Sequence, residues 1–239
     1  MDLMGEYTLL SLFGIMIQSI FIENFLLANF LGMCTYLACS NRLSTANGLG
    51  VAVVFVTAMS GMLNWGVHKF VTTPGALSWL SVFGIDASNI DLNFLEFLIF
   101  ISVIAGFVQV LEIIIEKFSP SLYNALGAYL PLITVNCAIL GTSLFAVTRG
   151  YPFLPNLFYV IGSGLGWWLA IALIAAIREK LAYSNIFPEL QGIAITFIMT
   201  GLMSMAFMGF TGVNLKDPVK ESARIPKKSI NERILSLKK

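Results

Sequence analysis

The sequence predicts an all-α integral membrane protein with six transmembrane helices, arranged as two inverted three-helix repeats in which broken helices carry the cysteines. Of its 239 residues, 57% are hydrophobic and only 11% are charged, and the mean hydropathy is +0.84. Soluble domains carry about 25% charged residues. The apolar residues form runs of about 20, each long enough to cross about 30 Å of hydrocarbon as a helix. A soluble protein would need polar outer faces, which these runs lack.

The apolar runs set the predicted spans and the domain boundary. The six spans lie at approximately residues 8–39, 48–68, 94–115, 124–147, 156–177 and 190–212. Residues 1–213 are therefore expected to form a polytopic membrane domain, and the basic polar tail at 214–239 has the composition of a disordered segment. The first residues lack the positive region of a cleavable signal peptide, so the first run is expected to be a retained helix.

The first run is too long for one upright helix. Glu23 and Asn24 interrupt it, so we expect a steep helix followed by a shorter piece. Lipid offers no hydrogen bonds to freed backbone groups, and the two polar side chains are expected to satisfy the backbone at this break. Glu23 is also a candidate for the path of an ion, because acids inside a membrane are costly and often functional.

The fourth run, YNALGAYLPLITVNCAILG, contains a second predicted break. Pro131 has no N–H, so the carbonyl of Gly127 loses its helical partner and the helix is expected to kink or break there. Such a break must face protein, a cavity or a cofactor. Asn136 and Cys137 follow, placing a polar group and a thiol near the middle of the span.

The two halves of the chain share a pattern. In each, a cysteine-bearing segment precedes a Gly-Leu-Gly that is predicted to begin a helix, and one more span follows. The residues concerned are Cys34, Gly48 and Gly50 in the first half and Cys137, Gly164 and Gly166 in the second. Because an odd number of spans repeats, the repeats, about 8–116 and 124–212, would insert in opposite directions. Glycines at such spacing also occur in ordinary packing of membrane helices.

Inverted symmetry would bring Cys34 and Cys137 face to face at the centre of the membrane. Thiolates there could hold a soft metal or an iron–sulfur cluster. A buried cysteine can equally be a small hydrophobic residue. A cluster uses four protein ligands, so two thiols would have to be complemented by a second chain. Cys39 lies on another helical face near the membrane edge and is expected to be structural.

The remaining polar residues bear on ion transport, catalysis and nucleic-acid binding. Glu112, beside Gln109, is a second candidate for an ion pathway, with a structural hydrogen-bonding role as the alternative. No catalytic triad can be assembled around His68, the single histidine, and no complete active site is evident. The formal net charge is +1 and no basic stripe with interleaved aromatics occurs, so nucleic acid is not an expected partner.

The charges in the loops do not settle the orientation. The links after spans one, three and five contain the cations Arg42, Lys117, Arg178 and Lys180, whereas the opposite internal loops hold Lys69 and Arg149. The internal loops favour termini outside the cytoplasm, and the basic tail favours termini inside.

Four segments carry a family resemblance: FIENFLLANFLGMCTYLA, LYNALGAYLPLITVNCAILG, GSGLGWWLAIALIAAIREKLAYS and ITFIMTGLMSMAFMGFTGV. They resemble the membrane subunits shared by Na⁺-translocating NADH:quinone reductases and the related Rnf complexes, up to about Val213. The resemblance implies a multi-pass protein of a bacterial inner membrane, with periplasmic termini. It further implies that a paralogous partner, the D component of the reductase, packs beside it in the opposite orientation, in a complex with the A, B, C and F components.

The resemblance also implies a function. Cys34 and Cys137 would hold a [2Fe–2S] cluster, or a mononuclear iron, shared with the partner. FAD, FMN, riboflavin and ubiquinone would bind elsewhere in the complex. This chain would relay electrons across the membrane and help couple the transfer to sodium export. The alternatives are a member of an Rnf-type ferredoxin:NAD oxidoreductase, a secondary transporter with inverted repeats, and a structural assembly protein. A transporter would tolerate replacement of the cysteines by serine.

Overall fold

The structure, a computed structural model, describes residues 9–72, 96–118, 130–184 and 192–212, and no strand occurs among them. The predicted tail at 214–239 and most of the loop at 69–93 lie outside these ranges. The first half contains α1 (Leu9–Ile17), η1 (Gln18–Ile22), α2 (Phe25–Asn29), α3 (Met33–Cys39), α4 (Leu43–Val67), η2 (His68–Thr72) and α5 (Glu96–Phe118). The second half contains α7 (Leu130–Thr134), α8 (Cys137–Thr148), α9 (Phe153–Leu181), α10 (Ile193–Met208) and η7 (Gly209–Gly212).

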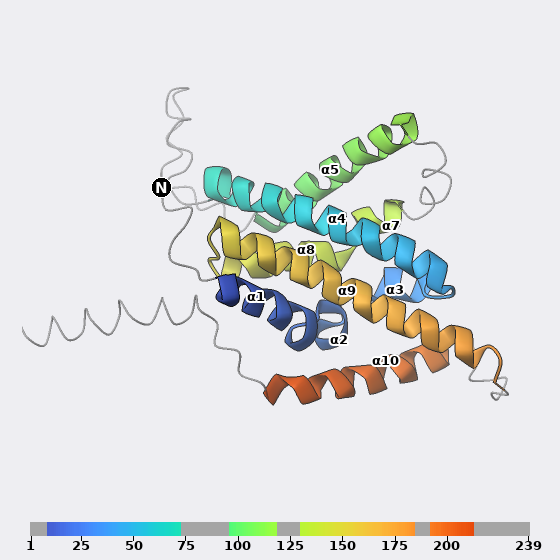
Figure 1. Cartoon of the computed structure of the whole chain (residues 1–239). Coiled ribbons are helices and arrows are strands. Elements are labelled where there is room, and N and C mark those ends of the chain that lie inside the picture. Colours follow the sequence, from blue (N-terminus) through green and yellow to red (C-terminus); the bar gives the residue numbers. More distant parts are fainter. Residues whose placement is uncertain (1–8, 73–95, 119–129, 185–191, 213–239) are drawn as a thin grey trace, which may run out of the picture.

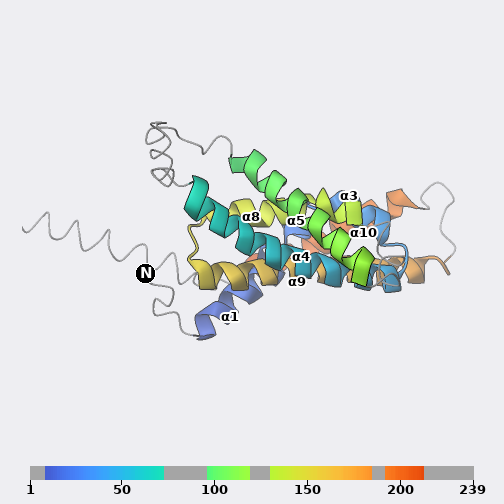
Figure 2. The same cartoon turned by 90° about the horizontal axis from the view of Figure 1, so that it is seen from above.

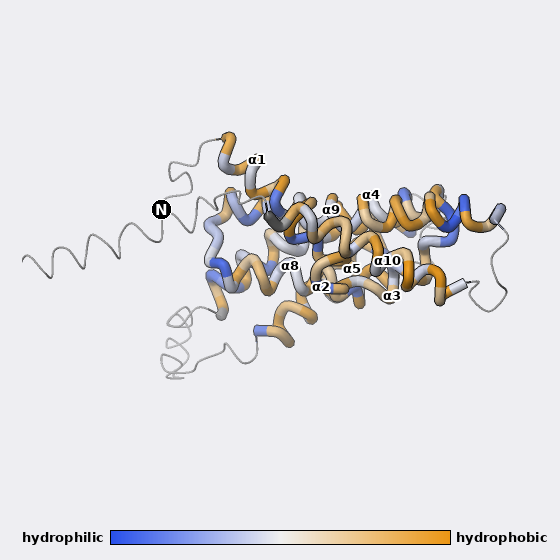
Figure 3. The backbone as a smooth tube through the Cα atoms, turned by 90° about the horizontal axis from the view of Figure 1, so that it is seen from below, coloured by the Kyte–Doolittle hydropathy of each residue, from blue (hydrophilic) through white to orange (hydrophobic). Residues whose placement is uncertain are grey.

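Four helical stretches in the described residues are long and apolar enough to cross a membrane. They are Leu43–Val71, Glu96–Lys117, Pro131–Thr148 and Phe153–Leu181. The first and last predicted spans are present as the shorter apolar helices Leu9–Ile22 and Ile193–Met208. Apolar residues follow the helices along their length (Figure 3). The all-helical, multi-pass class is therefore confirmed, while the count of six spans stays a prediction.

Helices α4 and α9 form the centre of the bundle, side by side in both views (Figures 1 and 2). Glycines allow their close approach: a Cβ at Gly164 would lie 3.1 Å from Val54 Cα, and one at Gly61 would lie 2.7 Å from the Val160 side chain. Residues later in α4 contact residues earlier in α9, so the two helices run antiparallel. Small residues at such a crossing let backbones pack tightly where lipid provides no hydrophobic drive.

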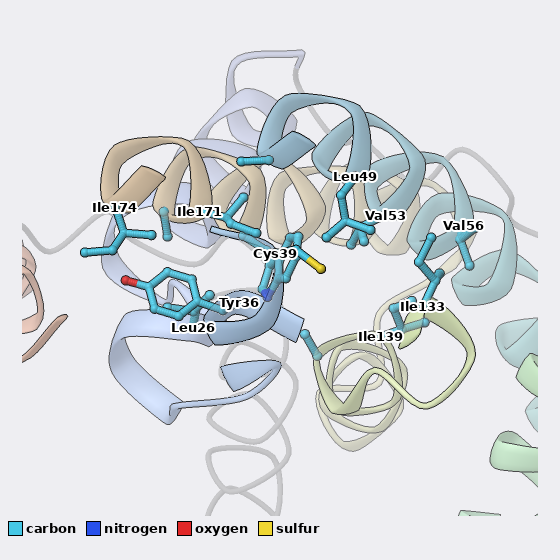
Figure 4. Packing of buried hydrophobic residues seen from close by; sticks show 14 of the residues in the cluster. Leu26, Tyr36, Cys39, Leu49, Val53, Val56, Ile133, Ile139, Ile171 and Ile174 are labelled. Atoms are coloured by element: carbon cyan, nitrogen blue, oxygen red, sulfur yellow. The ribbon is translucent and has the colours of Figure 1, made fainter. Parts of the chain in front are cut away.

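The core lies between this helix pair and the short helices α2, α3 and α8. Figure 4 shows the side chains of Tyr36 and Leu26 facing Ile171 and Ile174 of α9, with Leu49 and Val53 of α4 beside them. The hydroxyls of Tyr36 and Thr200 form a buried hydrogen bond of 2.9 Å, which joins α10 to α3. Packing against this core holds the short helices, since isolated helices of this length would not persist.

Polar contacts hold the two ends of the bundle. At one end Arg178 donates to Leu37 O and Ser40 Oγ, and Leu43 N donates to Glu179. At the other end Trp65 Nε1 donates to Tyr151 O, and Lys69 lies over the Trp65 ring. Arg178 and Lys69, which come from the two different sets of links, thus lie at opposite ends of the bundle. The described chain begins, in α1, at the same end at which α10 finishes (Figure 1).

Two sequence predictions about glycines are wrong. Gly164 and Gly166 do not begin a helix, because α9 starts at Phe153 with Pro152 as its N-cap and carries both glycines in its middle. Gly48 is exposed, and a Cβ there would meet no described residue within 4 Å, so it makes no close packing contact with the part of the chain that the structure describes. Gly50 does pack closely, because a Cβ there would overlap the indole of Trp168.

Candidate metal centre

The first interruption of the chain is built around Asn24. After the π-helical turn η1, Asn24 is the N-cap of α2, and its Oδ1 accepts hydrogen bonds from the backbone of Leu26 and Leu27. Its Nδ2 donates to Ile20 O and, at 2.8 Å, to Gly166 O of α9. Asn24 is only 1% exposed, and its four hydrogen bonds satisfy backbone groups that lipid could not.

A second, tighter turn leads from α2 into α3. Phe30 has a left-handed backbone (φ 55°), and so does Gly32 (φ 81°), which is the N-cap of α3. A left-handed non-glycine residue costs about 1–3 kcal/mol and often marks a functional site. Cys34 is the second residue of α3 and is exposed on this chain, so its thiol is accessible to another protein.

The second half carries a matching turn at Val135 and Asn136, between α7 and α8. Asn136 is the N-cap of α8 and accepts a hydrogen bond from Ala138 N at 3.0 Å. Cys137 is the first residue of α8. Pro131 lies in the first turn of α7 as described, and the residues before 130, where its predicted effect on Gly127 falls, lie outside the described ranges.

A single contact joins the two cysteine-bearing turns. The backbone N–H of Gly32 donates a hydrogen bond of 2.8 Å to Sγ of Cys137, although 105 positions separate them in the chain. Cys34 follows Gly32 by two residues, so its Cα lies at most about 7 Å from that of Gly32. The sulfur of Cys137 is therefore held in place by a backbone donor from the other half of the chain.

Gly32 also leaves room at this contact. A Cβ at Gly32 would lie 2.5 Å from Trp167 Nε1, 2.9 Å from Asn136 Oδ1 and 3.1 Å from Ala138 Cβ. Trp167 and Asn136 are 1% and 2% exposed, and Trp167 Nε1 and Asn136 Nδ2 have no hydrogen-bond partner within the described part of the chain. Spare buried N–H groups near the Gly32–Cys137 contact, with a second thiol two residues along the chain at Cys34, fit an anionic, sulfur-bound metal centre. Across the described ranges no group of three or more His, Cys, Asp or Glu converges, so these residues offer a partial ligand set.

Glu23, the acid at the first break, pairs with a side chain, whereas its position predicts contacts with the backbone. Glu23 forms an ion pair with Arg149, at the C-terminus of α8, and accepts from Gln18 Nε2 at 3.4 Å. Arg149 also lies over the rings of Tyr159 and Tyr151, 5.1 and 5.9 Å from their centroids. Asn24 alone caps the helix, and Glu23 ties the first half of the chain to the second.

Among the described residues no hydrogen bond or ion pair joins the other candidate residues to the two thiols. Glu112 is half-buried on α5 and has no hydrogen-bond or ion-pair partner among the described residues. Gly166 belongs to the site's surroundings, because a Cβ there would lie 3.0 Å from Ile20 O and 3.2 Å from Asn24 Nδ2. Gly50 and Gly164 serve the α4–α9 crossing.

Sequence reasoning missed Gly32, Trp167 and Arg149 at these contacts. A glycine between two apolar residues reads as packing, and only its positive φ shows that it shapes a turn. Trp167 stands beside Trp168, and the sequence does not show which of the two faces the core. Arg149 was expected in a loop, where an arginine is usually solvated.

These features define the class of protein as a helical, multi-pass membrane protein. The chain belongs to the Rnf-Nqr family of membrane proteins, with residues 12–214 matching. A curated relative from Chlamydia muridarum, named as the E component of a Na(+)-translocating NADH-quinone reductase, is 58% identical over 96% of this chain and 93% of its own length. Proteins of the same name from Chlamydia trachomatis serovar D and Hahella chejuensis are 60% and 51% identical, over 90% and 84% of this chain and 87% and 97% of their own lengths.

Proposed function

We propose that this chain is a membrane component of a Na⁺-translocating NADH:quinone reductase of the bacterial inner membrane, equivalent to its E component. In this role Cys34 and Cys137 supply two ligands to an iron–sulfur centre that the paralogous D component completes. The family match supports a membrane component of one of the two related complexes. The shared name of relatives 51–60% identical favours the reductase over an Rnf-type complex.

The observation that carries the proposal is the hydrogen bond from Gly32 N–H to Cys137 Sγ. It joins the turn before Cys34 to the turn that holds Cys137, from opposite halves of the chain. A transporter or an assembly protein would need no such contact at a sulfur atom. The exposed thiol of Cys34 suits a centre shared with a neighbouring chain.

The centre would accept and release one electron at a time. The chain's own part is to hold it: Cys34 and Cys137 bind it, and the Gly32 N–H orients the Cys137 sulfur. Asn136 fixes the N-terminus of α8, from which Cys137 projects, and Gly32 is the N-cap of α3, which carries Cys34. The apolar core around these turns excludes water and so limits side reactions.

We further propose that the two halves are inverted repeats with periplasmic termini. The antiparallel crossing of α4 and α9, the corresponding helices of the two halves, supports the inversion. Electron transfer would then accompany a rocking of one half against the other, as in transporters of this architecture. A covalent cross-link between α4 and α9 is expected to block quinone reduction, whereas one between α4 and α5, within one half, should not. Equal activity with both cross-links would refute the rocking.

The proposed ligands are tested by iron analysis and electron paramagnetic resonance on the purified complex. We expect Cys34→Ser and Cys137→Ser each to lose one iron signal together with quinone reduction, with the whole complex still assembled. Cys39→Ser is the matched control, since Cys39 is a core residue, 2% exposed, at the C-terminal end of α3, whereas the turn at Gly32 is at its N-terminal end. Unchanged iron and activity in the first two variants would overturn the proposal and favour a transporter or a scaffold.

A further inference from the structure

Two buried hydrogen-bond donors lie against the turn at Gly32, and nothing in the described part of this chain accepts a hydrogen bond from them. Trp167 Nε1 and Asn136 Nδ2 lack hydrogen-bond partners there, although their residues are 1% and 2% exposed. An unsatisfied buried donor costs about 1–3 kcal/mol, so such groups call for a specific explanation. Both side chains come from the second half of the chain and meet at a glycine of the first half.

The geometry brings these donors to the sulfur contact. A Cβ on Gly32 would lie 2.5 Å from Trp167 Nε1. Since a Cβ lies about 2.5 Å from its own backbone nitrogen, the indole Nε1 is at most about 5 Å from Gly32 N. That nitrogen donates to Cys137 Sγ. Asn136 adjoins Cys137 in sequence, and its Oδ1 is already used to cap α8, which leaves its Nδ2 as a spare donor.

We propose that Trp167 and Asn136 are positioning residues that donate hydrogen bonds to the sulfur-bound anionic centre held at Cys137, and that they raise its reduction potential. The inference rests on the proposed iron–sulfur centre and adds the residues that tune it. Hydrogen bonds to sulfur stabilise the more negative, reduced state, so they favour reduction. The absence of a Cβ at Gly32 leaves the space through which the indole N–H reaches the centre.

The neighbouring tryptophan provides a matched control. Trp168 has the same side chain one position along α9, but its Nε1 donates to Asn47 Oδ1 at 3.2 Å on the exposed side. Trp167→Phe removes the N–H and keeps an aromatic ring in the core, and Trp168→Phe removes a donor that is already satisfied elsewhere. Asn136→Asp keeps the oxygen that caps α8 while removing the spare amide donor.

The test is an electron paramagnetic resonance-monitored redox titration of the purified complex, with iron content and protein composition measured in parallel. Trp167→Phe is expected to keep its iron and to shift the one-electron reduction equilibrium about tenfold toward the oxidised form, which equals about 59 mV. Asn136→Asp should shift it in the same direction, and Trp168→Phe should leave it unchanged. These results together would support the assignment.

The outcomes separate this inference from the proposed function. A full iron signal with unchanged potential in Trp167→Phe and Asn136→Asp would overturn the inference and leave the centre at Cys34 and Cys137 intact. A wild-type complex with no iron signal that depends on these cysteines would overturn both. Loss of assembly in both variants would also overturn the inference, because the donors would then serve the fold.

Discussion

Replacing Asn24 by alanine tests whether the first helix break is a built feature of the fold. The side chain accepts hydrogen bonds from Leu26 N and Leu27 N and donates to Ile20 O and Gly166 O. In Asn24→Ala the two backbone N–H groups are left buried without acceptors, at about 1–3 kcal/mol each. Loss of a helix N-cap alone costs about 1 kcal/mol. We therefore expect a loss of about 3 kcal/mol in the free energy of unfolding.

A loss of this size corresponds to a fall of about 6–12 °C in the unfolding temperature of a chain of this length. The measurement is thermal unfolding of the complex in detergent, followed by the loss of this chain from the complex on size-exclusion chromatography. Asn47→Ala is the control, because Asn47 is exposed and only accepts from Trp168; its effect should stay within about 0.5 kcal/mol. Equal unfolding temperatures for the two variants would refute the reasoning that Asn24 holds the break.

Three further changes test other contacts. Gly50→Ala should lower the free energy of unfolding by about 1–3 kcal/mol, because its Cβ overlaps the Trp168 indole. Gly48→Ala should raise it by about 0.5–1 kcal/mol, because alanine favours a helix more than glycine does. Equal changes of the unfolding temperature in the two variants would contradict this prediction. Arg149→Met should cost about 1–2 kcal/mol by leaving Glu23 unpaired, and adding Glu23→Gln should recover part of the loss in the same assay. If Glu112 lies on the sodium path, Glu112→Ala should weaken the dependence of quinone reduction on sodium concentration, and an unchanged dependence would remove it from that path.

The sequence predicted helices where composition alone decides. Apolar runs of membrane length can form little else, because lipid leaves no partner for an open backbone. This reasoning located α4, α5 and α9 closely and placed Asn24 at an interruption of the first run. It failed at Gly164 and Gly166, because α9 begins well before them, directly after Pro152. The helix continues through both glycines without a break. A short Gly-Leu-Gly pattern does not distinguish a helix start from a helix crossing.

The contacts of the candidate site were beyond sequence reasoning for a related reason. The Gly32–Cys137, Asn24–Gly166 and Glu23–Arg149 contacts each join residues more than a hundred positions apart, and they exist only once the halves have packed. The two cysteines could be named as a pair because each lies in a segment that precedes a Gly-Leu-Gly, in corresponding places of the two halves. Trp167 could not, since a tryptophan in an apolar helix has an ordinary packing role and only its unpartnered N–H suggests another.

The three contacts share one property that bears on mechanism. Each pairs a turn or break of the first half with a helix of the second half, so the interruptions are also the places where the halves are fastened together. Asn24 bonds to the middle of α9, Gly32 to the start of α8 and Glu23 to its end. A movement of one half against the other must therefore stretch or exchange these contacts, and the one at Gly32 includes a proposed metal ligand. In this arrangement the position of the halves and the environment of the Cys137 sulfur change together, which is the physical requirement for coupling electron transfer to a conformational step.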